Sequence, residues 1–470
     1  MTATPTITDS PIHRARAFVL RRPTLMAAVF CLLSFTGFWI AQRAAQVSMV
    51  DLLVYRAEGW TVRHAADLYD MRATQHHLPN TYPPFAALVF TPLTLMGTGV
   101  LLTLGTAVNL VLMVAVAHLS LRLTGLPARV PRPAAVLVLA GVGVWCEPVW
   151  TTLRYGQINL LVAALVLWDL TRRTGHRWAG VGTGVATGIK LTPGLFVVFL
   201  GLAGVILGLG RLRAARASRS RGGPQKAGPP GRGVGNDHLR RATVATTAFV
   251  LTVAFSALAL PHDSRRFWTE IVFATDRPGD VEGAGNQNLK GALARLLHTP
   301  DPGMWWLVAA ALVGCVGLAT AVAAQLTDDS RLPHARAWAA LTCAVTALMV
   351  SPISWSHHWV WAVPMVSLLA VEAVRRRTAG WTAWTVVTGL LFCSFMVWYA
   401  PHSRPARVEL HQNAGQMLLT AVYPLIAIAF LSVAGYLTLR AVRRPREEAG
   451  PVRQVVTTGA GTPERSYVRG

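Results

Sequence analysis

Charged residues are scarce in this sequence, and acids are scarcer than bases. Charged residues make up 14% of the 470 residues, whereas about a quarter is usual for a soluble domain. Aspartate and glutamate together number 21 against 44 lysines and arginines, while hydrophobic residues make up 53% and the mean hydropathy is +0.41. This composition excludes an ordinary water-soluble domain and indicates an integral membrane protein.

Cysteine and lysine are also rare. Three of the 44 basic residues are lysines, at Lys190, Lys226 and Lys290, so each departs from the arginine that the chain otherwise uses. The five cysteines lie inside apolar segments without the spacing of a metal site, which excludes a disulfide framework and predicts buried thiols. They are Cys31, Cys146, Cys315, Cys343 and Cys393.

Apolar runs recur from residue 24 to residue 439, and each covers much or all of a hydrocarbon core of about 30 Å when helical. The run at 84–97 is too short to span comfortably, so we expect it to be re-entrant or interfacial. We therefore expect an all-α membrane protein with about 12 crossing helices. These lie at 24–42, 98–121, 133–153, 156–171, 178–190, 193–210, 242–260, 304–326, 337–350, 357–373, 380–399 and 414–439.

The net charge of +23 would suggest nucleic acid as a partner in a soluble protein, but the basic residues here lie in short stretches between apolar runs. Such stretches stay on the cytoplasmic side, so they orient the helices in the bilayer and imply no nucleic acid. They place both termini inside and the long loops 43–83 and 262–303 outside, where we expect short amphipathic helices. The orienting residues are Arg14, Arg16, Arg21, Arg22, Arg129, Arg132, Arg172, Arg173, Arg177, Arg375, Arg376, Arg377, Arg440, Arg443, Arg444 and Arg446.

The chain then divides into three parts. Residues 1–23 are a cytoplasmic N-terminal tail, residues 24–440 a transmembrane domain, and residues 441–470 a disordered cytoplasmic C-terminal tail. Within the domain, residues 211–241 carry nine basic residues against one acid, amid Gly, Pro and Ser. That composition predicts a disordered cytoplasmic loop.

This topology brings the polar segments to the extracytoplasmic face. Asp51 follows the first helix; a helical continuation puts Tyr55 on its face, and Glu58 is a candidate for that face too. The other segments are TYPP (81–84), RYGQIN (154–159), GIKLTP (188–193), NQNLKG (286–291) and SPISWSHHW (351–359). We infer one polar site on the outer surface.

Charged and aromatic candidates also have structural explanations. Asp51 taken alone is equally a solvated carboxylate at a helix end. Lys190, inside an apolar run, marks a phosphate or sugar contact unless it snorkels to the surface. His357 and His358 stand among tryptophans typical of an interfacial belt and lack zinc spacing, so we interpret them as phosphate or hydroxyl partners.

The remaining candidates are mostly amides. Gln157 and Asn159 offer donors and acceptors suited to hydroxyls, beside Arg154, an exception to the inward placement of arginine. Tyr82 suits stacking on a sugar or lipid, although an interfacial tyrosine needs no such role. Lys290 ends a polar run suited to a phosphorylated or polyhydroxylated ligand, where an asparagine is equally explained as a helix N-cap. That run holds Asn286, Gln287 and Asn288.

Taken in order, DLLVY, TYPPFAAL, GQINLLVAALVLWDL, GVGTGVATGIKLTPGLF, NQNLKG and SPISWSHHWVW resemble glycosyltransferase family 87, from about residue 25 to about residue 440. This family comprises polyprenyl-phosphate-mannose-dependent α-(1,2)-mannosyltransferases of actinobacteria. The resemblance implies a GT-C fold, with an active site that opens to the extracytoplasmic face and a catalytic aspartate in the first outer loop, where Asp51 stands. Asn80 departs from the family, which more often has an aromatic residue there.

The resemblance also implies a chemistry: mannose moves from polyprenyl-phosphate-mannose to a hydroxyl of a cell-envelope glycolipid or glycan. An α-linkage from a β-linked donor requires inversion, for which we expect Asp51 to act as general base. Fixed cations near the phosphate would make a metal or other cofactor unnecessary. We expect donor contacts from His357, His358, Lys190, Arg154 and Lys290, and sugar or acceptor contacts from Tyr82, Gln157, Asn159, Asn286, Gln287 and Asn288.

Two alternatives come from other classes of protein. A secondary transporter of about 12 helices would have internal repeats and ionisable residues near the midplane, whereas the polar residues here gather at one face. A lipid-linked oligosaccharide ligase or polymerase would share the outer-face site and the lipid-phosphate substrate. The sequence leaves the acceptor open.

Overall fold

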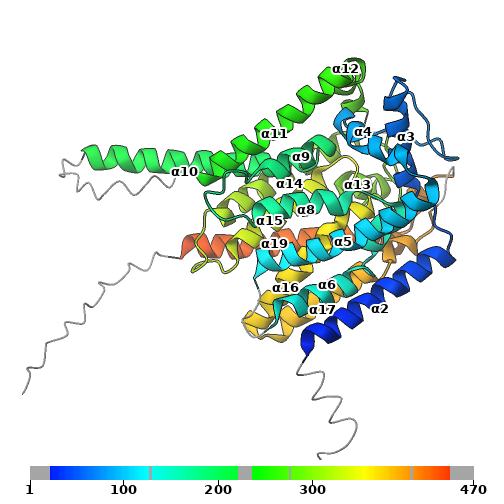
Figure 1. The fold of residues 1–470 in the computed structure, drawn as a ribbon. Coiled ribbons are helices and arrows are strands. Elements are labelled where there is room, and N and C mark those ends of the chain that lie inside the picture. The colour runs from blue at the N-terminus through cyan, green and yellow to red at the C-terminus, as the bar shows by residue number, and fades with distance from the viewer. Residues whose placement is uncertain (1–21, 126–129, 221–235, 275–276, 403–405, 445–470) are drawn as a thin grey trace, which may run out of the picture.

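The structure, a computed structural model, describes residues 22–125, 130–220, 236–274, 277–402 and 406–444. Within these ranges the fold is all-helical, and the pairing of extended segments is confined to two isolated bridges, Ala73 with Leu78 and Asn286 with Trp355. Most helices run side by side in one bundle (Figure 1). The predicted all-α membrane fold is confirmed for this part of the chain.

Seven helices in the described ranges are long and apolar enough to cross a membrane. One of them consists of two consecutive parts: a short 3₁₀ segment, η4 (Ser356–Trp361), and the α-helix that follows it, α16 (Ala362–Arg376). The other six are α2 (Pro23–Ala44), α5 (Thr98–Thr124), α10 (Gly194–Ser220), α11 (Asp237–Ala259), α14 (Gly303–Gln325) and α19 (Val422–Arg443).

The other predicted crossings contain shorter helices. Residues 133–153 are not one helix, because α6 (Arg132–Gly143) and α7 (Glu147–Tyr155) meet at an angle of 73°. Pro148 near the start of α7 has no amide hydrogen to continue an earlier helix, which favours a new helix start. The remaining short helices are α8 (Asn159–Leu170), α9 (Val181–Ile189), α15 (Ala335–Val350) and α17 (Ala379–Cys393).

The last predicted crossing, 414–439, is also divided. A short helix, α18 (Ala414–Thr420), precedes α19, and the asparagine before it, Asn413, forms a capping box with Gln416. Every predicted crossing thus contains helix, but the number of helices that traverse the bilayer stays a prediction.

Helix α15 is the centre of the bundle. Its side chains are buried on all sides, among them Trp338, Cys343 and Met349, and it packs against α14, α10 and α19. A helix that is apolar all round belongs in an interior. The long helices around it instead expose apolar side chains on their outer faces, as Leu312 and Val316 of α14 do, which suits contact with lipid.

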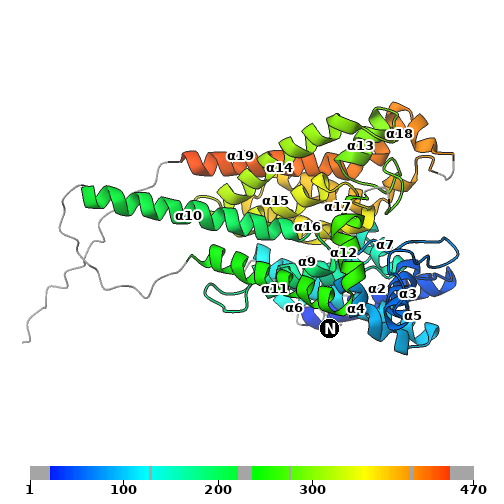
Figure 2. The ribbon, with the colours of Figure 1, turned by 90° about the horizontal axis from the view of Figure 1, so that it is seen from above.

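The short helices expected in the outer loops are present, and they gather at one end of the bundle (Figures 1 and 2). They are α3 (Val50–Arg63), α12 (Pro261–Thr269) and α13 (Leu289–Leu296). Segment 84–97 lies with them as α4 (Pro84–Phe90) followed by a 3₁₀ turn, η2 (Thr91–Leu95), and both pack against α3. Its re-entrant or interfacial position stays a prediction.

The predicted disordered loop 211–241 is too long. Helix α10 continues to Ser220 and α11 begins at Asp237, so both ends of the segment are helical, and residues 221–235 lie outside the described residues. The start of α11 is fixed by Asn236, which accepts a hydrogen bond from the Leu239 amide, and by Asp237, paired with Arg241 at 2.6 Å. Local capping overrides the composition there.

The tails lie largely beyond the described ranges. Of the predicted N-terminal tail, Arg22 and Pro23 are described, and α2 begins at Pro23. Of the C-terminal tail, residues 441–443 end α19, so they are not disordered as predicted. Residues 1–21 and 445–470 are outside the described part of the chain.

All five cysteines are free thiols, but they are not uniformly buried as predicted. Cys315 is exposed because α14 turns that side of its surface outward, and Cys393 is half-buried. The sulfur of Cys393 lies 3.3 Å from that of Cys146, so these two thiols are in contact.

Candidate active site

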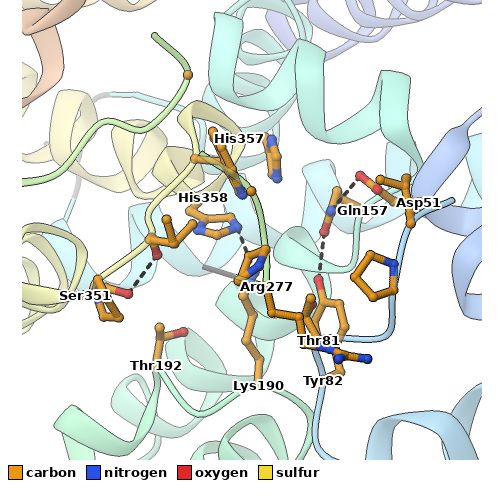
Figure 3. Close-up of a pocket in the computed structure, with 18 of the residues that line it drawn as sticks. Asp51, Thr81, Tyr82, Gln157, Lys190, Thr192, Arg277, Ser351, His357 and His358 are labelled. Carbon is orange, nitrogen blue, oxygen red and sulfur yellow. Dashed lines mark hydrogen bonds between the residues drawn. The ribbon is translucent and has the colours of Figure 1, made fainter. Parts of the chain in front are cut away.

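A cavity of about 1030 Å³ opens at the end of the bundle where the short helices gather. A volume of this size is at the upper end for small-ligand sites, so it has room for more than one group of a substrate. Most of the polar segments that the sequence analysis assigned to one face contribute to its wall (Figure 3). The predicted site residues that line it are Asp51, Tyr82, Gln157, Lys190, His357 and His358.

One wall of the cavity holds Asp51 in a hydrogen-bonded network. Gln157 donates from Nε2 to Asp51 Oδ2 at 2.6 Å, and its Oε1 accepts from the hydroxyls of Tyr55 at 2.7 Å and Tyr82 at 3.2 Å. The two tyrosine hydroxyls are 2.9 Å apart, and the Tyr55 ring stacks on Phe90 of α4. The amide of Gln157 is thereby held in one orientation, with its NH₂ group toward the carboxylate.

Two backbone features place this wall. Helix α3 begins after Met49, whose φ of 50° turns the chain sharply and puts Asp51 in the first turn. Gly156 ends α7 with φ of +69°, and a Cβ atom there would lie 2.6 Å from that of Leu52. Glycine therefore allows the α7–α8 turn to approach α3 closely enough for Gln157 to reach Asp51.

The environment of Asp51 suits a proton acceptor. Burial raises the pKa of Asp51 to about 6, against the opposing effects of the Gln157 hydrogen bond and the positive charge of Lys190. A carboxylate with a pKa of about 6 is still mostly ionised at neutral pH, and it is more basic than an ordinary aspartate.

Opposite Asp51, nitrogen atoms converge from two segments. Lys190, directly after α9, donates from Nζ to Asn159 Oδ1 at 2.9 Å and lies 3.0 Å from His358 Nε2. The carbonyl of His357 accepts from Asn159 Nδ2 at 3.0 Å, which ties the histidine segment to α8. Nε2 of His357 is buried and has no hydrogen-bond partner among the described residues. In Figure 3, Lys190 lies below the histidines, and Asp51 lies across the view beside Gln157.

Glu147 fixes the segment that carries the histidines. Its side chain is fully buried, and Oε1 accepts hydrogen bonds from Thr151 at 2.8 Å, Ser356 at 2.7 Å and Trp398 at 2.9 Å. Its Oε2 accepts one from the hydroxyl of Tyr423 at 2.6 Å. One carboxylate thus joins α7, η4, α19 and the 3₁₀ turn η5 (Met396–Trp398).

Two predicted sugar contacts do not reach the cavity wall. Asn286 donates from Nδ2 to the carbonyl of Val281 at 2.8 Å, and its Oδ1 accepts from the amide of Ser354 at 2.9 Å. Asn288 is the N-cap of α13 and accepts from the amide of Gly291 at 2.7 Å. These side chains hold the NQNLKG loop against the histidine segment, so the capping explanation applies to Asn288.

Three further candidates also lie off the cavity. Gln287 is fully buried and donates from Nε2 to the carbonyl of Thr420 at 2.6 Å. Lys290 is nearly buried, with its ammonium 4.9 Å from the centre of the Trp306 ring. Arg154 is exposed at the end of α7. Sequence position placed these residues near the site, but their side chains point elsewhere. Asn159 lines a smaller adjoining pocket.

Three charged residues of the cavity wall had no predicted role: Glu58, Arg277 and Glu409. Arg277 donates from Nε to the carbonyl of Asn80 at 2.7 Å, which fixes the turn before Tyr82. Its signal in the sequence is weak: it is an arginine in a loop predicted to lie outside. Glu58 lines the cavity from α3 and is fully buried.

A possible metal-binding cluster lies apart from this cavity. The ligand atoms of Asp67, His262 and Asp263 are all within 4.8 Å of one another, and none of the three residues lines the cavity. The guanidinium of Arg266 already pairs with Asp67 at 2.8 Å, and the Leu68 amide donates to Asp263 at 2.9 Å. The positive charge that this cluster attracts is therefore supplied by the protein.

Comparison with known families gives a match over more than half of the chain: the model of glycosyltransferase family 87 matches residues 80–218 and 233–352. The chain belongs to glycosyltransferase family 87. The matched ranges contain Tyr82, Gln157 and Lys190, whereas Asp51 and the histidine pair lie outside them. What connects those residues to the matched part is their common cavity.

Curated relatives extend the similarity over most of the chain. A polyprenol-phosphate-mannose-dependent alpha-(1-2)-phosphatidylinositol pentamannoside mannosyltransferase of Mycobacterium tuberculosis is 32% identical over 391 residues, which cover 81% of this chain and 79% of the relative. A polyprenol-phosphate-mannose-dependent alpha-(1-2)-phosphatidylinositol mannoside mannosyltransferase of Mycolicibacterium smegmatis is 31% identical over 434 residues, covering 88% and 90%. No solved structure matches the chain.

Family membership decides the class of protein. The chain is a glycosyltransferase of the GT-C type and a multi-pass membrane protein, as the motifs and the apolar helices predicted. The secondary transporter and the oligosaccharide ligase or polymerase belong to other families, so both alternatives are set aside.

Proposed function

We propose that this glycosyltransferase moves mannose from polyprenol-phosphate-mannose to a hydroxyl of a phosphatidylinositol-mannoside glycolipid and forms an α-(1,2) linkage. The names of the relatives support the donor, the linkage and the class of acceptor. The observation that carries the proposal is the cavity itself, with a basic carboxylate, Asp51, facing the nitrogens of Lys190 and His358.

The reaction is a single displacement. The acceptor oxygen attacks the anomeric carbon of mannose while Asp51 takes the proton of that hydroxyl. The bond from the anomeric carbon to the phosphate oxygen breaks, and its electron pair leaves with the lipid phosphate. A β-linked donor then gives an α-linked product. Asp51 is protonated at the end of this step and loses the proton to water before the next cycle. General-base catalysis of this kind contributes roughly 10² to 10⁴ in rate.

The nitrogens across the cavity stabilise the leaving group. Negative charge develops on the phosphate oxygen as the bond breaks, and donors already in place at that point lower the barrier. Lys190 Nζ donates to His358 Nε2 at 3.0 Å, so Lys190 is the donor beside this pair that a phosphate oxygen can contact. His357 Nε2, which has no partner among the described residues, supplies a further donor when its ring is in the Nε2–H tautomer.

The lipid tail of the bound donor extends from the site into an apolar pocket that adjoins the cavity. This pocket of about 40 Å³ shares Lys190 and His358 with the cavity and is walled by Phe196, Leu348 and Trp361. Its volume is too small for a prenyl unit without side-chain movement, so the lipid must displace part of the wall between α10 and α15. The phosphate would then stay at Lys190 and His358 while the tail enters the bundle.

These fixed donors also make a metal ion unnecessary for the transfer. We expect the purified enzyme to keep its activity in EDTA, because the groups that face the phosphate are nitrogen donors of the chain itself. Loss of transfer in EDTA and its recovery with Mg²⁺ or Mn²⁺ would contradict this part.

The site would open on the extracytoplasmic face, with both chain ends in the cytoplasm. The basic stretches support this orientation. A reporter enzyme that is active only outside the cytoplasm should be inactive when fused after the C-terminus and active when inserted beside Asp301, in the exposed loop before α14. The opposite pattern would reverse the orientation.

The proposal is tested by mannose transfer in membranes supplied with polyprenol-phosphate-mannose and phosphatidylinositol mannoside. Wild type should add single mannose units, and Asp51→Asn should lower kcat by about 10² to 10⁴ at equal expression. Asp301→Asn is the matched control, because Asp301 is exposed and off the cavity. Near-normal turnover by Asp51→Asn would refute the base assignment, and transfer of preassembled glycans would refute the proposed reaction.

A further inference from the structure

Glu58 is a second carboxyl group on the face of α3 that carries Asp51. It follows Asp51 by seven residues and Tyr55 by three, spacings that keep all three on one side of a helix. Its side chain is fully buried and lines the cavity. Seven residues of helix place it roughly 10 Å along the axis from Asp51. The mechanism proposed above does not use it.

Neither carboxyl oxygen of Glu58 has a hydrogen-bond partner among the described residues. Two other carboxyl groups near the cavity differ: Asp51 accepts from Gln157, and Glu147 accepts from four donors. A buried polar group without a partner destabilises the folded state, and an apolar residue of similar size would not. Packing alone therefore does not account for a glutamate at this position.

The backbone of α3 cannot easily move the carboxyl away. Gly59 packs so closely on the next helix that a Cβ atom there would lie 2.8 Å from the carbonyl oxygen of Phe90 and 2.9 Å from Cα of Thr91. This contact presses α3 against α4 and η2, directly beside Glu58. The backbone that carries Glu58 is thus held beside the cavity.

Burial also determines the protonation state of Glu58. It raises the pKa of Glu58 well above its ordinary value, and the nearby negative charge of Asp51 raises it further. A neutral carboxylic acid has one O–H donor and a carbonyl acceptor. It can therefore give one hydrogen bond to a sugar hydroxyl and accept another.

We propose that Glu58 binds a sugar hydroxyl in the cavity, as donor and acceptor together, and so helps select the sugar that the enzyme uses. This rests on the transferase function proposed above. Because Glu58 is about two helical turns from Asp51, it contacts a different hydroxyl from the one that Asp51 deprotonates. That hydroxyl belongs either to the donor mannose or to the acceptor glycan.

The test compares Glu58→Leu and Glu58→Gln with wild type in the same transfer assay, with donor and acceptor varied separately. Glu58→Leu removes both hydrogen bonds and should raise KM for one substrate by about three- to tenfold. Glu58→Gln keeps a neutral donor and acceptor and should stay within about threefold of wild type. Thr61→Val on α3, off the cavity, is the control.

Thermal unfolding of the ligand-free protein separates binding from a structural role. Because Glu58→Leu removes an unpartnered buried carboxyl, the melting temperature should be unchanged or higher while KM rises. A KM change for polyprenol-phosphate-mannose assigns the contact to the donor, and one for the glycolipid assigns it to the acceptor.

Unchanged KM for both substrates, or unfolding of both the Leu and Gln variants, would overturn the proposal for Glu58. Failure of wild type itself to transfer mannose would instead refute the function proposed for the enzyme.

Discussion

The hydrogen bond from Gln157 to Asp51 sets the acid limb of the pH profile. General-base catalysis needs ionised Asp51, so kcat/KM should fall as pH drops through the pKa of about 6. The Gln157 amide stabilises the ionised form at 2.6 Å. Removing this donor in Gln157→Leu should therefore raise the pKa of Asp51.

The size of this shift follows from the strength of the bond. A hydrogen bond to a charged group contributes about 1.5–3 kcal/mol, and about 1.4 kcal/mol corresponds to one pKa unit. In Gln157→Leu, the acid limb of the kcat/KM profile should shift to higher pH by about one to two pH units. Ionised Asp51 at pH 7 would fall from roughly nine-tenths to half or less, and activity should recover toward pH 9.

The assay is kcat/KM for mannose transfer between pH 5 and pH 9. Tyr82→Phe is the matched control, because Tyr82 contacts Gln157 at 3.2 Å rather than Asp51, so its limb should stay near that of wild type. An acid limb at the same pH in Gln157→Leu and wild type would refute the reasoning. A rate loss that is equal at every pH would mean that Gln157 acts on the substrate alone.

Three further predictions concern the phosphate contact, the buried Glu147 carboxylate and the packing of α3. Lys190→Met should lower kcat by about 10² to 10³ with unchanged folding, because one fixed donor to the leaving group is lost; unchanged kcat in the transfer assay would exclude this role. Glu147→Leu should lower the free energy of unfolding by about 3 kcal/mol or more in denaturant melts, since Ser356, Trp398 and Tyr423 lose their acceptor; an unchanged midpoint would contradict that. Gly59→Val should displace α3 and abolish most transfer, since its Cβ would meet the Phe90 carbonyl at 2.8 Å, and normal activity would show that α3 tolerates the shift.

Much of the site followed from patterns that are local in the sequence. Apolar runs define helices, and basic stretches assign the segments between them to a side. Because successive crossings alternate the side of the membrane, these rules predicted that Asp51, Gln157 and Lys190 lie at one end of the bundle. That prediction needed no information on packing. The cavity confirms that these three residues meet.

Side-chain direction was less predictable. Asn286 and Asn288 lie in a segment that contacts the site, yet their amides bond to the backbone of Ser354 and Gly291. A polar loop that caps a helix and one that binds a sugar use the same residue types. The sequence therefore located the loop but not its role.

The sequence by itself determined that this chain is an all-helical membrane glycosyltransferase, because hydrophobicity, charge and family motifs need no tertiary contacts to be recognised. Only the tertiary structure decided which groups face the cavity. Glu58 lines it from the segment of α3 that Gly59 packs on α4, and Gln157 reaches Asp51 because Gly156 lets two distant segments touch. Such orientations depend on contacts between residues far apart in the chain, which local patterns do not encode.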